Sequence, residues 1–351
     1  MKEIRDLFID KQASINTTLK KMDDVRSKLL IVGSEKIFEG LISIGDLQRA
    51  IIKNIDLSTP ISTVLRKDII VAQEGDDDEK IKKRMFTIRA EFMPVLNEHN
   101  EVVDVIFWED LLDATKLPPS EKINFPVVIM AGGKGSRLKP ITNVLPKPLI
   151  PIGDKPIVQH IMERFVDVGS NKFYFTVNYK SELIEYYFNS FEHPQYSIQY
   201  LKEKEFFGTA GSLSLLNGLI DSTFFVSNCD IIIDQDYSEI YRYHKANENE
   251  LTLVAALKHY KIPYGTVETG YNGSLEEIQE KPEITYKINA GLYILEPHLL
   301  DEIPQNQFFH ITDLIDKIKN RGGKVGVFPV SEKSWKDIGE WDEYLKNKEW
   351  K

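Results

Sequence analysis

The sequence predicts two domains, the larger of which has an α/β fold with a mainly parallel central sheet. Three observations predict this architecture. The chain has 351 residues, which exceeds the usual single-domain size of roughly 100 to 200 residues. After residue 124, short apolar runs alternate with helical stretches, a pattern typical of parallel strands covered on both faces. The first third instead carries a weak internal repeat, which predicts a small α+β domain.

The domain limits follow from the same pattern. We expect the α+β domain at residues 1–116, a linker at 117–123 and the α/β domain at 124–351. Pro118 and Pro119 stiffen a short polar stretch there, which suits a connection between domains. In the larger domain we expect a helix over 157–168 and strands over 126–131, 173–177 and 223–226.

Composition restricts the classes of function. The net charge of −10 argues against general nucleic-acid binding, which depends on Lys and Arg that neutralise phosphates. No run approaches the roughly 20 apolar residues of a membrane span, and the first ten residues lack the apolar core of a signal peptide. The single cysteine, Cys229, excludes an intrachain disulfide and fits a reducing compartment. We therefore expect a cytoplasmic protein without nucleic-acid or membrane partners.

The internal repeat appears when residues 31–47 are laid over residues 95–111 without gaps. Each copy runs from strand through turn to an acid at a helix start, which is Asp46 in the first copy and Asp110 in the second. A carboxylate at such a position can cap the helix or complement its dipole. The repeat resembles a CBS pair, a module that senses adenosine nucleotides.

The resemblance to a CBS pair implies ligand contacts from Ser43 and Asp46, to the phosphate and the ribose. The second copy departs from the pattern, because Phe107 replaces the hydroxyl residue and leaves only Asp110. Two alternatives stay open. Both aspartates can serve only as helix caps, and the pair can serve only dimerisation rather than binding of an adenine nucleotide effector.

A glycine-rich loop follows the first expected strand of the larger domain, at the edge where α/β sheets bind ligands. Its glycines let the backbone turn sharply and present N–H groups to phosphate oxygens, while its cations add positive charge. The glycines are Gly132, Gly133 and Gly135, and the cations are Lys134, Arg137 and Lys139. The loop therefore indicates a polyphosphate ligand.

Two better-known phosphate motifs are excluded at this loop. The dinucleotide fingerprint needs a third glycine where Leu138 stands, and the P-loop needs Gly-Lys followed by Ser or Thr. A glycine-rich turn alone is also compatible with a tight strand-to-helix connection, so the interpretation depends on other residues.

Those residues follow along the chain. Lys147 lies between two prolines, which hold a flexible ammonium near one place. Gly208 allows close backbone approach, and Thr209 is expected to cap a helix that continues through Leu219.

Two acids complete the set of candidates. Asp230 stands at the end of an expected strand, and Asp337 lies far downstream. Magnesium usually takes one or two protein carboxylates and fills its shell with water and substrate phosphates, so two acids suffice. We expect Mg²⁺ as the cofactor, although each aspartate alone also fits a structural cap.

The motifs AGGKGSRL, LPKPL, FFGTAGSL, NCD, QEKP, INAGLY and WKDIG occur in the order found in the sugar-1-phosphate nucleotidylyltransferase family. The resemblance covers essentially all of residues 124–351 and implies a Rossmann-like nucleotidyltransferase domain. Its departures are small. Ser136 stands where threonine is commoner, and Cys229 stands where a smaller residue is usual.

The resemblance implies a role for each matching position. Arg137 and Lys147 would be catalytic, with Lys147 on the sugar phosphate, and Asp230 and Asp337 would hold the metal. The implied nucleotide-binding positions are Ala131, Gly132, Gly133, Gly135, Ser136, Glu203, Gly208 and Thr209. The implied sugar-side positions are Gly265, Glu280, Lys281 and Asn289.

The implied reaction is in-line attack by a sugar phosphate oxygen on the α-phosphorus, with pyrophosphate leaving. No general base is needed, because a phosphate monoester with a second pKa of about 6 is already largely dianionic at pH 7. The protein then has to position the anions and neutralise their repulsion. The alternative to an enzyme is a catalytically inactive relative that only senses nucleotides or regulates a partner.

Glu203 stands five residues before Gly208, at the base-reading position of the family. A carboxylate only accepts hydrogen bonds, and guanine offers adjacent N–H donors, so GTP is favoured. The stretch EKEFFGTAG is similar to that of mannose-1-phosphate guanylyltransferases. A CBS pair ahead of such a domain resembles the glucosamine-1-phosphate guanylyltransferases of bacterial legionaminic acid biosynthesis.

We therefore expect GTP and glucosamine-1-phosphate as substrates of a homo-oligomer. Mannose-1-phosphate with GTP, or a uridylyl or cytidylyl enzyme, are the alternatives.

Overall fold

The computed structural model describes residues 4–34, 36–88, 90–108, 121–190 and 195–347. The chain divides into two compact units, residues 1–120 and residues 121–351. Among the described residues, no helix has the length and apolar character needed to cross a membrane.

The N-terminal unit contains the same structural motif twice. Each copy has a strand, a helix and an antiparallel pair of strands, and its first strand lies parallel to the second. The two copies lie 64 residues apart, since Phe8 opens β1 and Ala72 opens β4. The first copy comprises β1 (Phe8–Ile9), α1 (Ile15–Val25), β2 (Leu29–Ser34), β3 (Ile37–Ser43) and α2 (Ile44–Ile52). The second comprises β4 (Ala72–Gln73), α3 (Asp78–Ile88), β5 (Phe92–Leu96) and β6 (Val102–Phe107).

Polar contacts join the two copies. One carboxylate oxygen of Glu91 accepts hydrogen bonds from the Ser27 hydroxyl at 3.0 Å and from the Lys28 backbone N–H at 2.7 Å. The Phe38 backbone N–H donates to the Asn100 carbonyl at 3.0 Å. The repeat is therefore one packed pair.

The larger unit is built on one seven-stranded sheet in the order β11-β10-β7-β12-β17-β14-β18. Every neighbouring pair is parallel except the two pairs that involve β17, so the prediction of a mainly parallel central sheet is confirmed. The strands are β7 (Val127–Ala131), β10 (Lys172–Val177), β11 (Ser197–Lys202), β12 (Phe224–Asn228), β14 (Leu251–Lys261), β17 (Glu283–Leu295) and β18 (Val325–Val330).

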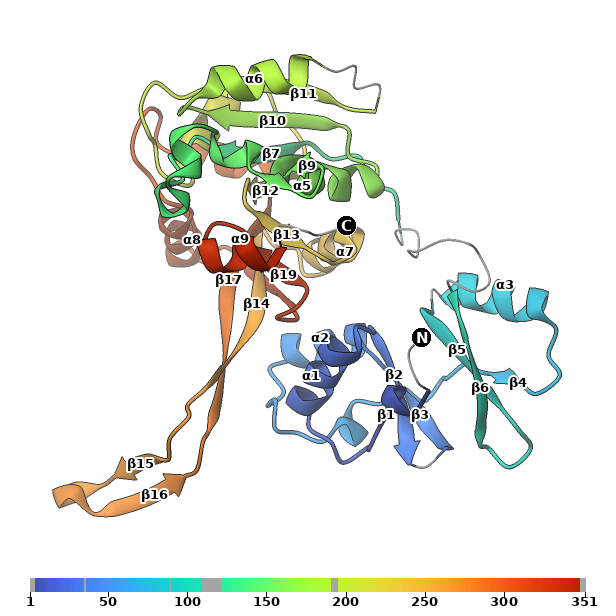
Figure 1. Cartoon of the computed structure of the whole chain (residues 1–351). Helices are drawn as coiled ribbons and strands as arrows, with labels where there is room; N and C mark the ends of the chain where they lie inside the picture. The colour runs from blue at the N-terminus through green and yellow to red at the C-terminus, as the bar shows by residue number, and fades with distance from the viewer. Residues whose placement is uncertain (1–3, 35, 89, 109–120, 191–194, 348–351) are drawn as a thin grey trace. The chain divides into compact units, whose positions relative to one another are not determined.

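Shorter elements surround this sheet (Figure 1). The α-helices are α5 (Ile157–Asp167), α6 (Ser181–Asn189), α7 (Tyr237–Ala246), α8 (Ile311–Asn320) and α9 (Trp341–Asn347). The 3₁₀ helices used below are η3 (Ser136–Leu138), η5 (Lys147–Leu149), η6 (Gly211–Leu216) and η8 (Pro297–Glu302). The small strands are β8 (Pro151–Ile152), β9 (Lys155–Pro156), β13 (Ile231–Ile233), β15 (Thr266–Thr269), β16 (Leu275–Gln279) and β19 (Trp335–Asp337).

Alternation along β12 explains why both faces of the sheet are covered. Phe225 points to one face, where its ring contacts Phe165 of α5 at a centroid distance of 5.3 Å. Phe224 and Val226 belong to the core on the other face, which α8, η6 and η8 complete. Because successive side chains of a strand point to opposite faces, the apolar run of β12 serves two layers.

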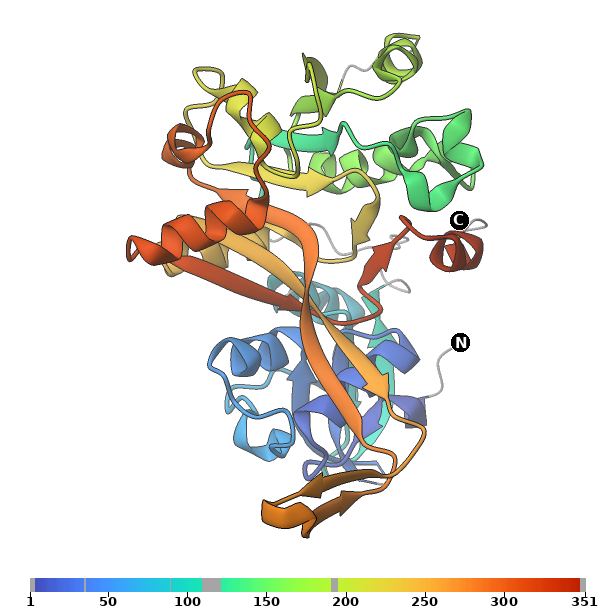
Figure 2. The same cartoon turned by 90° about the vertical axis from the view of Figure 1, so that its left-hand side faces the viewer.

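The strands β14 and β17 continue beyond the sheet as a two-stranded ribbon. Their pairing extends without a third strand to Lys261 and Glu283, and the hairpin β15–β16 follows at the tip. Figures 1 and 2 show this arm projecting from the rest of its unit. The arm comprises residues 258–287, with a stem (258–261 and 281–287) and a tip (266–280).

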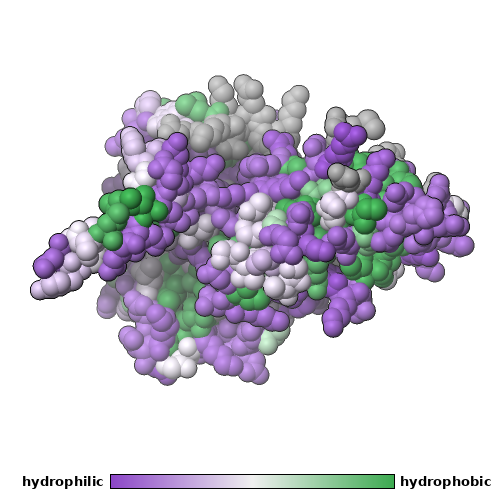
Figure 3. Space-filling view, turned by 90° about the horizontal axis from the view of Figure 1, so that it is seen from below, coloured by the Kyte–Doolittle hydropathy of each residue, from purple (hydrophilic) through white to green (hydrophobic). Residues whose placement is uncertain are grey.

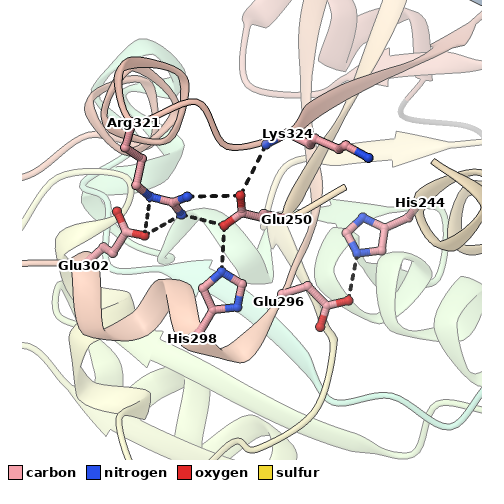
Figure 4. Close-up of polar contacts among 7 residues, drawn as sticks. All are labelled: His244, Glu250, Glu296, His298, Glu302, Arg321 and Lys324. Carbon is pink, nitrogen blue, oxygen red and sulfur yellow. Dashed lines mark hydrogen bonds and ion pairs between the residues drawn. The ribbon is translucent and has the colours of Figure 1, made fainter. Parts of the chain in front are cut away.

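A polar network fixes the opposite end of β14 (Figure 4). Arg321, just after α8, donates to both oxygens of Glu250 and to Glu302 of η8. His298 of η8 contacts Glu250 at 2.7 Å. The hydrogen bonds from Arg321, together with those from His298 and the Lys324 backbone, outweigh burial and lower the pKa of Glu250 to about 2.

Candidate active site

Strand direction brings two chain segments together at one edge of the sheet. β7 and β12 are parallel neighbours, so the segments that follow them leave from the same edge. The glycine-rich loop follows Ala131, and Asp230 lies two residues beyond the end of β12. The distant Asp337 joins them because β19 pairs with β13, which places Ile231 opposite Asp337.

The glycine-rich loop depends on one glycine for its shape. Gly135 has φ +62°, and a Cβ there would lie 2.8 Å from Thr142 Cγ2 and 3.1 Å from Lys147 Cβ. The Thr142 hydroxyl donates to the Gly135 carbonyl at 3.0 Å and holds the turn. A Cβ on Gly133 would meet nothing within 4 Å, so the loop has open space at that residue.

Asp230, Asp337 and Lys147 converge beside this loop. The Lys147 ammonium donates to Asp230 Oδ2, and both side chains are largely buried, with 13% and 9% of their surface exposed. A Cβ on Gly339 would lie between 2.5 and 2.9 Å from Asp230 Oδ2, Asp337 Oδ1 and Lys147 Nζ. Two carboxylate oxygens and one cation therefore meet at one point.

The electrostatics of this cluster fit a divalent cation. Burial raises the pKa of Asp337, and the negative charge of nearby Asp230 raises it further. The pKa of Lys147 is raised although burial opposes the charged form, because the Asp230 charge stabilises the ammonium. Lys147 offsets only one of the two carboxylate charges, and two converging carboxylate oxygens are a donor set that suits Mg²⁺.

The C-terminal segment supplies contacts that the sequence did not reveal. Arg137 Nη1 donates to Glu340 Oε1 at 2.8 Å across 203 residues of chain. Trp341 Nε1 donates to the Lys139 carbonyl at 2.8 Å. Glu340 and Trp341 could have been identified from the sequence by their position just after Asp337. Asp337 is a candidate metal ligand at the end of a strand, so the residues that follow it must also lie near the site.

Glu203 lies against the start of the glycine-rich loop. A Cβ on Gly132 would collide with Glu203 Oε1. The other carboxylate oxygen accepts the Phe207 backbone N–H at 3.2 Å, and burial raises the pKa of Glu203. The structure thus brings the expected base-reading residue to the expected loop.

The expectation for Thr209 as a cap of its own helix was wrong. The following segment is the short η6, and neither Thr209 nor its N-cap residue Ala210 caps it through a side chain. Instead the Thr209 hydroxyl accepts the Ile311 backbone N–H at 3.0 Å, at the start of α8. Gly208, with φ +82°, permits this packing, because a Cβ would lie 2.7 Å from the Phe309 carbonyl oxygen.

The expected sugar-side residues lie in two separate places. A Cβ on Gly265 would lie 3.0 Å from Glu280 Oε2, and Lys281 follows directly, so these three lie together on the projecting arm. Asn289 lies within the sheet on β17, where its side chain contacts the Tyr293 hydroxyl at 2.8 Å and accepts the Gly291 N–H at 3.0 Å. A Cβ on Gly291 would lie 3.3 Å from Ile231 Cδ1, so Asn289 is near the strand that follows Asp230.

The N-terminal candidates Ser43 and Asp46 form a capping box at the start of α2. Asp46 is buried and also accepts hydrogen bonds from Arg49 and, at 2.5 Å, from Arg66 Nε. Burial alone would raise its pKa, but the bonds from Arg66 and Ser43 hold the pKa of Asp46 below its usual value. Asp110 lies outside the described residues.

Cys229 is buried, and burial raises the pKa of its thiol to about 12. It therefore behaves as a small apolar residue beside Asp230 and not as a nucleophile.

Comparisons with known proteins place the larger unit among relatives. A family model described as Nucleotidyl transferase matches residues 126–349, which is more than half of the chain. Mannose-1-phosphate guanyltransferase of Gibberella zeae is 35% identical over 184 residues, which are 50% of this chain and 50% of that protein. The bifunctional protein GlmU of Methanocaldococcus jannaschii is 34% identical over 235 residues, 63% of this chain and 53% of that protein. The chain thus spans about half the length of these relatives.

Among solved structures, HddC from Yersinia pseudotuberculosis is similar, with a TM-score of 0.51 and 26% identity. The alignment covers 64% of this chain and 98% of HddC. The same protein complexed with GMP-PN gives the same values.

Proposed function

Because the chain belongs to the nucleotidyl transferase family, we propose that it transfers GMP from GTP to a sugar 1-phosphate, with glucosamine 1-phosphate as the leading acceptor. The products would be a GDP-sugar and pyrophosphate. The observation that carries this proposal is the convergence of Lys147, Asp230 and Asp337 beside the glycine-rich loop. One ammonium and two carboxylates beside a glycine-rich backbone support a magnesium-bound polyphosphate as the substrate.

The chain's own residues would act by positioning and charge. The open backbone of the loop at Gly133 would receive the triphosphate, and Arg137 would exchange its exposed pair with Glu340 for a phosphate oxygen. Lys147 would turn from Asp230 to the acceptor phosphate. When bound to Asp230 and Asp337, Mg²⁺ would supply Lewis-acid neutralisation of phosphate charge.

The bond changes then balance without a general base. An acceptor phosphate oxygen forms a bond to the α-phosphorus while the bond from that phosphorus to the pyrophosphate oxygen breaks. Arg137 and Lys147 would hold the two anions together, so positioning and charge neutralisation would supply the rate enhancement.

Glu203 supports guanine as the base. Its carboxylate is held between Gly132 and the Phe207 N–H, where it can only accept hydrogen bonds while ionised. The guanyltransferase name of the Gibberella zeae relative and the GMP-PN bound to HddC support the same base. Mannose 1-phosphate is the alternative acceptor, as the name of that relative indicates.

For the N-terminal unit we propose a CBS pair that binds an adenine nucleotide through Ser43 and Asp46. A ligand ribose would have to replace the hydrogen bonds that Arg66 and Arg49 now make to Asp46. Calorimetric titration of AMP and ATP into the whole protein tests this, with Asp46→Asn as the variant that should lose the heat of binding. Absence of heat in the unmodified protein would leave only the dimerisation role.

The deciding experiment for the enzyme is pyrophosphate release with Mg²⁺ across the nucleoside triphosphates and a panel of sugar 1-phosphates. We expect turnover with GTP, lost in Asp230→Asn and Asp337→Asn. Asp234→Asn is the matched control, because this exposed aspartate follows β13 and is paired with Arg164 instead of Lys147. If no sugar 1-phosphate supports pyrophosphate release while GTP still binds, the function would instead be nucleotide sensing.

A further inference from the structure

Three consecutive residues follow β10 at the edge of the sheet where the candidate site lies. Asn178, Tyr179 and Lys180 come directly after Val177, the last residue of β10. β10 lies parallel between β7 and β11, so its end stands between the glycine-rich loop and the segment that begins with Glu203. This tripeptide, named here the β10 segment, is therefore placed to contact the chain on both sides of it.

Asn178 holds the backbone of the expected base-reading residue. Its Nδ2 donates to the Glu203 carbonyl at 2.9 Å. The Glu203 N–H donates to the Val177 carbonyl, also at 2.9 Å. Both backbone polar groups of Glu203 are thus bonded to the chain at the end of β10, while its carboxylate accepts the Phe207 N–H. These bonds fix the point from which the carboxylate reaches the start of the glycine-rich loop.

Tyr179 and Lys180 hold the opposite neighbour. The Tyr179 hydroxyl donates to the Thr142 carbonyl at 3.2 Å. The Lys180 ammonium donates to the next two carbonyls along the chain, the second at 2.9 Å. These carbonyls close the 3₁₀ helix at Ile141–Asn143. Since the last carbonyls of a helix lack partners inside it, donors from the β10 segment fix the end of this helix.

Thr142 connects this contact to the glycine-rich loop. The residue is buried, and its hydroxyl donates to the Gly135 carbonyl at 3.0 Å. Its carbonyl is bonded to Tyr179 and its hydroxyl to Gly135, so one residue joins the β10 segment to the turn. The shape of the proposed phosphate-binding loop therefore depends on side chains that follow β10.

The backbone of Lys180 indicates that its side chain has a use. Lys180 has φ 53° and ψ 38°, the left-handed conformation that favours glycine, at the residue before α6. A lysine in this conformation carries a strain that glycine would avoid. Glycine would, however, lose both hydrogen bonds of the ammonium.

We propose that the β10 segment positions both halves of the nucleotide site. Asn178 sets base selection through Glu203. Tyr179 and Lys180 set triphosphate affinity through the turn that Thr142 ties to the glycine-rich loop. The inference rests on the proposed function, because it takes GTP as the ligand, and it makes these three side chains positioning residues.

The arm provides a contrast, because it carries the expected sugar-side residues Gly265, Glu280 and Lys281. Figure 3 shows apolar residues gathered on this projecting arm, bordered by hydrophilic ones. The hydrogen bonds of the β10 segment described above end on residues 142–144 and 203, outside the arm. Tyr179→Phe should therefore raise the KM for GTP and leave the KM for the sugar 1-phosphate unchanged, whereas general loosening of the unit would raise both.

Displacement of a fluorescent GTP analogue from the full-length protein by GTP and by ITP tests the phosphate side. The two nucleotides share the triphosphate and differ only in the exocyclic amine of the base. Tyr179→Phe removes one hydrogen bond and should weaken both roughly fivefold, with an unchanged ratio. Lys180→Met should act in the same direction, and Lys180→Arg should retain affinity. Tyr186→Phe is the matched control, because it removes an exposed hydroxyl from α6.

The same displacement assay tests the base side with Asn178→Leu, which removes the amide donor. GTP should lose more affinity than ITP, because the extra N–H donor of guanine needs a positioned carboxylate. Adding Asn178→Leu to Glu203→Gln should change the ratio no further, because the two residues act in series. A ratio in Asn178→Leu equal to that of the unmodified protein contradicts the role in base selection.

The proposed function and this inference fail in different ways. An unmodified protein that binds no GTP would overturn the proposed function, and the inference with it. GTP binding that is equally tight in the unmodified protein, Tyr179→Phe and Lys180→Met would overturn the inference alone.

Discussion

Lys147→Met tests whether the ammonium stands in for a metal ion. In the unmodified protein the Lys147 charge compensates Asp230, which already raises the pKa of its neighbour Asp337. Methionine keeps the aliphatic length but removes the charge, so two largely buried carboxylates face each other without a cation. The folded state should therefore lose stability, and added Mg²⁺ should restore much of it.

The magnitude follows from the burial of the pair. Breaking a buried ion pair by removing one partner costs about 3 kcal/mol or somewhat more, and these side chains are 13% and 9% exposed. For a unit of this size, 1 kcal/mol shifts the melting temperature by about 2–4 °C, so the shift should be about 6–12 °C. Thermal unfolding in EDTA and then with excess MgCl₂ measures both effects.

The double variant with Asp230→Asn provides the control. Removing both charges of the pair should cost less than Lys147→Met alone, because no uncompensated Asp230 carboxylate remains buried. Asp230→Asn should also abolish the selective rescue by Mg²⁺. The reasoning is refuted when Lys147→Met melts like the unmodified protein in EDTA, or when Mg²⁺ stabilises both proteins equally.

Three further predictions concern other parts of the larger unit. Burial raises the pKa of Glu203, so the charged carboxylate destabilises the folded protein at pH values above that pKa. Glu203→Gln should therefore raise the melting temperature at pH 8 but not at pH 4. The same variant should show a weaker preference for GTP in competition binding. Arg321→Met should lower the free energy of unfolding by about 1 kcal/mol at pH 7. In urea titrations this difference should shrink as pH falls from 5 through the Glu250 pKa of about 2, because the carboxyl then becomes protonated in both proteins. Gly135→Ala should lower the free energy of unfolding by about 1–2 kcal/mol, because Gly135 has a positive φ, and it should raise the KM for GTP. Gly133→Ala should leave the melting temperature unchanged.

The central sheet could be predicted because its strands carry a strong local signal. The runs at 127–131, 172–177 and 224–228 are apolar on both faces, and the predicted limits differ by only one or two residues. The arm could not be predicted in this way. Its strands extend beyond the sheet and expose Tyr260 and Ile278, so no burial pattern distinguishes them from other surface segments.

The candidate site was only partly predictable for a different reason. Motif order identified the loop, Lys147 and both acids, because each stands at a recognisable strand end or turn. The partners Glu340 and Arg66 are ordinary exposed charges in the sequence, and their contacts join residues 203 and 20 positions apart. Thr209 was assigned to the wrong helix, because its local pattern fits a cap equally well for η6 and for the distant α8.

The segment after β19 explains why the loop and the acids form a single site. The Ile338 N–H donates to the Asp230 carbonyl, and the Gly339 N–H donates to Asp337. The next residue, Glu340, holds Arg137, and α9 begins with a tryptophan that is bonded to the Lys139 carbonyl. Four consecutive residues thus bond, in turn, to the Asp230 backbone, the Asp337 carboxylate, the Arg137 side chain and the Lys139 backbone, the last two in the second half of the glycine-rich loop. The segment after β19 therefore contacts both the acids and the glycine-rich loop, which is why chain positions 137, 230 and 337 belong to one site.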